Sequence, residues 1–131
     1  MGVAITIRDE TPAGQELRTF TLDCLKARLS VRELIRARIY QEVREFNARQ
    51  PEEFQGLVQP TETEKTLNGY RVKKGRRIDW EEQTRRAMEA FETNGFILLV
   101  GARQAAGLDE EFDVSVDTEV GFVKLVPLLG G

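Results

Sequence analysis

The sequence predicts a single α+β domain, residues 1–131, in which a mixed sheet wraps around one long helix. Two observations carry this prediction. Two alternating apolar–polar stretches near the N-terminus precede one long amphipathic segment, and strand patterns return in the last third of the chain. With 131 residues, 40% of them hydrophobic and 31% charged, the chain is long enough to bury a core of its own.

The first two stretches predict a β-hairpin. Residues 3–9 (VAITIRD) alternate between branched apolar and polar or small side chains, as a half-buried strand does. A turn signal that contains Pro12 follows. Residues 16–23 (ELRTFTLD) alternate again, and Phe20 and Leu22 fall on the side expected to face the core.

A long helix is predicted between Ser30 and Pro51. Ser30 and Glu33 match the S-x-x-E capping box that begins many helices. Apolar residues then recur every three or four positions and form one stripe, which consists of Val31, Ile35, Ile39, Val43 and Phe46. The solvated face of this helix is expected to carry Arg32, Arg36, Glu42 and Glu45.

Residues 51–94 are predicted to be an insertion with weak local structure and a second helix. Proline, glycine and Asn-Gly signals interrupt its first part, in which 61–67 are compatible with a short helix. The second helix begins after an N-cap at Asp79, and Asn94 and Gly95 supply its C-terminal stop. We expect this helix to cover the sheet face that the first helix leaves open; the alternative is an apolar patch on that face that stays exposed for a partner.

Strand patterns return in the last third of the sequence. Residues 96–101 (FILLVG) form a continuous apolar run, and a short strand is predicted near 112–115 (FDVS). The final strand spans 119–127 (EVGFVKLVP) and closes at Pro127, because proline cannot donate to a sheet ladder. This strand is apolar enough to lie inside the sheet.

Composition narrows the class of function. The chain has 19 Lys and Arg against 22 Asp and Glu, a net charge of −3, so we expect neither nucleic acid nor membrane as a partner. A single cysteine and no sign of a signal peptide indicate the cytoplasm. The sequence contains no histidine, the commonest general base and transition-metal ligand. We therefore expect no enzymatic activity, no metal site and no cofactor.

Two short features each allow two interpretations. The basic segment at 72–77 (VKKGRR) could bind phosphate, but a solvated loop is favoured in a net acidic chain. Cys24 could accept an acyl group through its thiol, but a small buried side chain is the commoner role at the junction of a strand and a helix.

The last six residues, VPLLGG at 126–131, are the most specific feature of the sequence. Glycine makes up about 7% of residues on average, so two in succession at a chain end arise by chance in about 0.5% of cases. Together with the hairpin–helix order, this ending resembles the β-grasp fold of ubiquitin-like proteins. The segment DTEVGFVKLVPLLGG, residues 117–131, resembles the ends of sulfur-carrier proteins and bacterial ubiquitin-like modifiers. The resemblance leaves out residues 51–94.

The resemblance implies that the carboxylate of Gly131 is a substrate for other proteins. An activating enzyme would use its own ATP to adenylate this carboxylate, and a thiol would then capture it as a thioester. A conjugating enzyme, a deconjugating peptidase and a target protein are further implied partners. Gly130 and Gly131 lack Cβ and so fit a narrow channel. Pro127, Leu128 and Leu129 would be recognised as parts of a flexible tail at 127–131.

Three functions follow from this resemblance. The favoured one is a ubiquitin-like modifier, conjugated through the carboxylate of Gly131. A sulfur carrier would bear a thiocarboxylate on the same atom. A β-grasp interaction module that is never conjugated would have incidental glycines.

Overall fold

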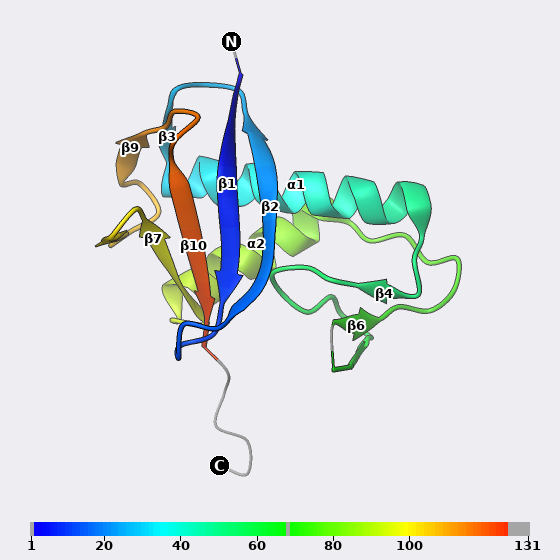
Figure 1. Cartoon of the computed structure of the whole chain (residues 1–131). Coiled ribbons are helices and arrows are strands. Elements are labelled where there is room, and N and C mark those ends of the chain that lie inside the picture. The colour runs from blue at the N-terminus through cyan, green and yellow to red at the C-terminus, as the bar shows by residue number, and fades with distance from the viewer. Residues whose placement is uncertain (1, 68, 126–131) are drawn as a thin grey trace.

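The computed structural model describes residues 2–67 and 69–125. Within these residues the main layer is a five-stranded mixed sheet in the order β2-β1-β10-β7-β8 (Figure 1). Its strands are β1 (Val3–Glu10), β2 (Glu16–Cys24), β10 (Glu119–Lys124), β7 (Phe96–Val100) and β8 (Arg103–Gln104). The central pair, β1 and β10, is parallel, and the other neighbours are antiparallel. The α+β class, the N-terminal hairpin and the interior position of the final strand are therefore confirmed.

The long helix α1 (Val31–Arg49) has the predicted start and stripe. The Glu33 N–H donates to Ser30 Oγ at 3.1 Å, and the Ser30 N–H donates to Glu33 Oε1 at the same distance, which completes the capping box. All five predicted stripe residues are buried. The helix ends where Gln50 adopts a left-handed conformation, φ 45°, and its N–H bonds to Phe46 O.

The second helix, α2 (Trp80–Glu92), begins as expected. The Asp79 side chain caps it by accepting a hydrogen bond from the Glu81 N–H at 3.0 Å. The helix lies beside α1 on the same face of the sheet, and Figure 1 shows both helices behind the strands. The expectation that it covers the opposite face is therefore wrong.

Aromatic contacts explain this position of α2. Trp80 packs edge-on against Tyr40 of α1, with ring centroids 5.5 Å apart. At the other end of α2, Phe91 packs against Phe96 of β7 at 5.8 Å. Phe96 in turn meets Phe122 of β10, so the apolar side of α2 completes the core that α1 begins.

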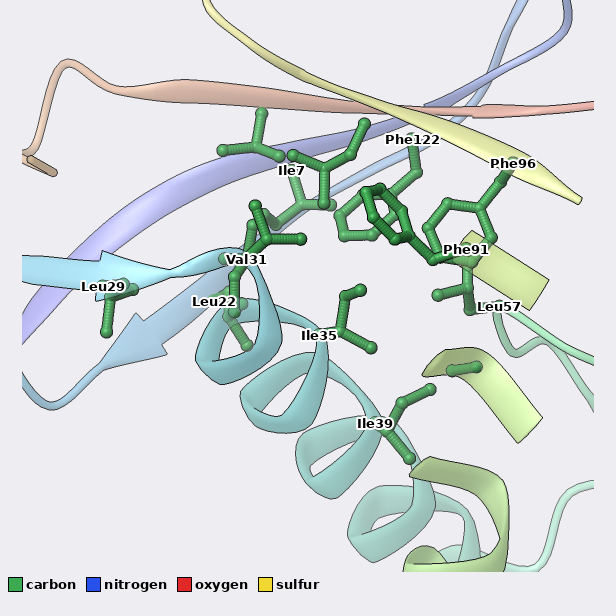
Figure 2. Close-up of a cluster of buried hydrophobic side chains, with 14 of the residues drawn as sticks. Ile7, Leu22, Leu29, Val31, Ile35, Ile39, Leu57, Phe91, Phe96 and Phe122 are labelled. Carbon is green, nitrogen blue, oxygen red and sulfur yellow. The ribbon is translucent and has the colours of Figure 1, made fainter. Parts of the chain in front are cut away.

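The core lies between the sheet and the two helices (Figure 2). Side chains from β1, β2, β7 and β10 point down onto α1 and α2 in this view. The fully buried residues include Ile5, Ile7, Leu22, Leu34, Ile35, Ile39, Leu98, Val120 and Phe122. The other face of the sheet carries the partly exposed Ile97 and Leu99 of β7 and Val123 of β10.

The first part of the insertion forms a small three-stranded sheet in the order β4-β6-β5. Its strands are β4 (Glu53–Phe54), β5 (Glu64–Lys65) and β6 (Tyr70–Arg71). Residues 61–67 form a turn followed by β5, so the interpretation of this segment as a short helix is wrong. Glu62 takes a left-handed conformation with φ 54°, which a right-handed helix does not allow.

A second small pair joins β3 (Arg28–Ser30) to β9 (Glu111–Asp113). Arg28 holds this pair through Glu111 Oε1 at 2.9 Å and Asp113 Oδ1 at 3.1 Å. The short strand predicted at 112–115 is thus present, beginning one residue earlier. Among the described residues, no helix is long and apolar enough to cross a membrane.

Candidate functional site

The predicted site residues Pro127, Leu128, Leu129, Gly130 and Gly131 lie outside the described residues. The structure places the point from which they continue. Strand β10 runs between β1 and β7, and the Leu125 N–H after it donates to Gly95 O at 3.1 Å. The last described residue before the tail is therefore held by the loop that joins α2 to β7.

A buried ion cluster lies beneath this end of β10. Arg38 of α1 is 0% exposed, and its Nη1 and Nη2 donate to the two oxygens of Asp9 at 2.5 and 2.7 Å. Its Nε donates to Glu42 Oε2 at 3.3 Å. The guanidinium also lies 4.5 Å from the ring centroid of Phe122 and 5.1 Å from that of Phe20.

The same cluster binds the insertion. The Leu57 N–H donates to Glu42 Oε1 at 3.0 Å. Lys124 Nζ donates to Gly56 O at 3.2 Å and lies 3.9 Å from Asp9 Oδ2. Two carboxylates and two cations thus join β1, α1, β10 and the first residues of the insertion at one point.

Glu42 was expected on the solvated face of α1, and this expectation is wrong. The side chain is buried, with 6% exposure, because it accepts the Leu57 N–H and pairs with Arg38. The sequence did contain a signal for this arrangement. Positions 38 and 42 fall within the apolar stripe, four residues apart, and opposite charges at that spacing form pairs on a helix.

Burial has opposite effects on the two titratable groups at the edge of this cluster. It raises the pKa of Glu42, and the charge of Arg38 and the Leu57 N–H oppose this rise. It lowers the pKa of Lys124, against which the Asp9 carboxylate acts. Each group has a partner of opposite sign or a backbone hydrogen bond, which offsets part of the cost of burying its charge.

A cleft of about 460 Å³ opens next to the cluster, and we call it the base cleft. It is enclosed by the β1–β2 hairpin, the insertion, the α2–β7 loop and the end of β10. Residues on its lining include Leu17, Arg18, Lys65, Leu67, Lys124 and Leu125. The cleft therefore lies where the chain leaves the sheet toward the diglycine.

Neither of the two ambiguous features joins this site. Cys24 is 1% exposed, and burial raises the pKa of its thiol to about 11, so it is a protonated core side chain at neutral pH. In the basic segment, Arg76 Nη1 donates to Thr61 O at 2.5 Å and its Nη2 donates to Thr61 Oγ1 at 3.2 Å. Arg76 thus links two parts of the insertion, the basic segment and the turn that contains Thr61.

Comparison of the chain with protein-family models, with curated proteins and with solved structures gives no match.

Proposed function

We propose that this chain is a ubiquitin-like modifier of β-grasp type, whose Gly131 carboxylate is activated by another protein. One observation carries the proposal: the motif VPLLGG follows β10, the strand at the centre of the sheet, after one intervening residue, Leu125. The β-grasp assignment draws support from the parallel pairing of β1 with β10 and from α1 packed across one face. The insertion is an addition to that plan.

The proposed chemistry takes place on the tail and is performed by an activating enzyme. A carboxylate oxygen of Gly131 attacks the α-phosphorus of ATP, and pyrophosphate leaves. A thiolate of the enzyme then attacks the carbonyl carbon, AMP leaves, and a thioester forms. An amine of the target finally displaces the thiolate and gives an amide. Glycine suits these steps because no Cβ obstructs approach to the carbonyl.

The contacts of the two described residues that precede the tail, Lys124 and Leu125, support this role for the tail. Leu125 is bonded to Gly95, and the preceding Lys124 is bonded to Gly56 and lies near Asp9. A partner that binds the tail would therefore bind a segment whose starting point is already fixed by hydrogen bonds. Fixing one end of a substrate lowers the entropy that the partner must remove on binding.

A sulfur carrier is the second candidate, and the tail sequence itself favours it. Pro127, Leu128 and Leu129 are apolar, as in the short apolar tails of sulfur carriers. In that case hydrosulfide would attack the acyl adenylate, AMP would leave, and a thiocarboxylate would remain on Gly131.

The direct test is ATP–pyrophosphate exchange in an extract of the organism that encodes the chain. Adding the full chain should stimulate exchange, and hydroxylamine should convert its terminal carboxylate to a hydroxamate that is visible by intact mass. Deleting Gly130 and Gly131 should abolish both signals. The matched control is a bulky fusion: at the N-terminus it should leave exchange intact, and at the C-terminus it should block it.

Three outcomes separate the candidates. Amide-linked adducts of the chain isolated from its host support the modifier. A mass increase equal to one sulfur-for-oxygen exchange identifies the sulfur carrier. No exchange, with cellular function unaffected by the C-terminal fusion, leaves the unconjugated interaction module and overturns the proposal. The same mass measurement shows whether the chain in its host ends at Gly131.

A further inference from the structure

The base cleft is lined by structurally fixed groups. Arg18 Nη1 donates to Gln55 O at 2.7 Å and so joins β2 to the insertion. Lys124 Nζ donates to Gly56 O at 3.2 Å and so joins β10 to the same segment. Gly56 fits there because a Cβ would overlap the Phe54 ring. The walls of the cleft are thus held together by cross-links between segments far apart in the sequence.

Two leucines on the cleft are unusually exposed. Leu17 of β2 is 52% exposed, and Leu67 of the insertion is 96% exposed. Both belong to the same cleft lining, to which Tyr70 and Leu125 add further apolar surface. Exposed apolar side chains that gather around one hollow are typical of a surface that binds another polypeptide.

The charge of the cleft is opposite in sign to that of the whole chain. Its described lining carries three cations, Arg18, Lys65 and Lys124, and one anion, Asp9. The Asp9 carboxylate is already bound by both terminal nitrogens of the buried Arg38. The chain as a whole has a net charge of −3, so the excess of cations in the cleft differs from that average and favours an acidic partner here.

We infer that the base cleft is the docking site for an acidic, leucine- or phenylalanine-containing segment of the enzyme that activates the diglycine tail. This inference rests on the proposed function. Apolar side chains of the enzyme segment would contact Leu17 and Leu67, while carboxylates of the same segment would pair with Lys65 and Arg18. Leu125 lines the cleft and is separated from the tail at 127–131 by a single residue of sequence, so a partner that binds here contacts the last described residue before the tail.

Docking in the cleft would act on recognition and leave the chemical step unchanged. The proposed contacts do not involve the Gly131 carboxylate, so they are the same before and during adenylation. Loss of these contacts should therefore raise the KM for the chain in the exchange reaction and leave kcat unaltered.

The test compares two double variants in the exchange assay. Lys65→Glu with Leu67→Ala changes two exposed residues of the cleft, and Lys74→Glu with Leu25→Ala makes the same changes at exposed positions outside the cleft lining. We expect the cleft variant to raise the KM at least about tenfold, the equivalent of one good contact, with kcat unchanged. The control variant should match the unmodified chain, and thermal unfolding of both verifies that the fold is intact.

A second measurement tests the cleft without any activating enzyme. A fluorescent peptide of alternating aspartate and leucine should bind the full chain and lose affinity in the cleft variant only. A lysine–leucine peptide of equal length should not bind.

The possible failures are distinguishable. Diglycine-dependent exchange with an unchanged KM in the cleft variant overturns the inference and leaves the proposed function standing. Equal effects of the cleft and control variants also overturn it. Absence of exchange with the unmodified chain overturns the proposed function, and the inference falls with it even if the acidic peptide binds.

Discussion

The core beneath the sheet and the inserted residues 51–79 are held together by different forces. Apolar side chains from β1, β7, β10 and α1 fill the core in a regular two- and four-residue spacing. Residues 51–79, the part of the insertion that precedes α2, bury few apolar residues, chiefly Phe54, Leu57, Val72 and Ile78. Their backbone is instead bound by polar side chains that reach out from the helices.

Each of these polar contacts joins a helix to a backbone group of the insertion. Asn47 bonds both the N–H and the carbonyl of Ile78, at 2.8 and 2.9 Å. Gln83 donates to Val58 O at 3.1 Å, and Arg86 donates to Gln59 O at 3.0 Å. A segment whose strands are only two residues long can therefore be ordered when neighbouring helices supply further hydrogen-bond partners for its backbone.

The largest effect is expected where the two regions meet, at Arg38. Replacing Arg38 with alanine leaves Glu42 buried without its ion-pair partner and leaves Asp9 with Lys124 alone, which should cost about 3–5 kcal/mol of unfolding free energy. Urea unfolding measures this loss. Arg44→Ala, an exposed change on the same helix, should stay within about 0.5 kcal/mol. Equal losses in the two variants would contradict a special role for the buried cluster.

A smaller and more local effect is expected at Asn47. Asn47→Ala leaves the N–H and carbonyl of Ile78 without this partner, which should cost about 1–3 kcal/mol. Amide hydrogen exchange should accelerate at Ile78 more than at core amides such as that of Ile39. Asn47→Asp keeps the acceptor for the Ile78 N–H and should show an intermediate effect. Uniform acceleration across the core would show that the insertion and the core unfold together.

The pH dependence of Glu42 gives a third comparison. Its raised pKa means that the folded chain binds more protons than the unfolded chain between the ordinary glutamate pKa and the raised value. Stability contributed by this group therefore falls as pH rises through that window. Glu42→Gln lacks this titration, so its stability relative to the unmodified chain should improve with rising pH. Chemical unfolding across the window, from acid to neutral pH, tests the sign; a constant difference would contradict it.

The smallest effect is expected at Leu67. Leu67→Ala removes a side chain that is 96% exposed, so the unfolding free energy should change by no more than about 0.5 kcal/mol. Differential scanning calorimetry is sufficient to measure the shift in Tm. A large loss would mean that Leu67 packs within the fold, which would remove it from any docking surface.

The sequence predicts the core because its pattern is local. The stripe that contains Ile35 and Ile39 repeats with the helix period, and the capping box at Ser30 and Glu33 places the start of α1. The strand that ends at Val100 follows from its apolar run. These signals need no knowledge of what lies far away in the chain.

The insertion and the ion cluster depend on contacts between distant residues, which periodicity does not encode. Asp9 pairs with Arg38 across 29 positions, and Lys124 reaches Gly56 across 68. The helical spacing of Arg38 and Glu42 is visible in the sequence, but their burial depends on Asp9 and Leu57. The base cleft is lined by four separate parts of the chain, so no single sequence motif predicts it.

The central position of β10 has a consequence for synthesis on the ribosome. Strands β1 and β7 are made first, but neither can pair with its central neighbour until residues 119–124 have emerged. An incomplete chain therefore exposes two open strand edges and is a target for chaperones or proteases. Residues 130 and 131 follow β10 by only a few positions, so a chain truncated before β10 lacks both its central strand and the glycines that the proposed function requires.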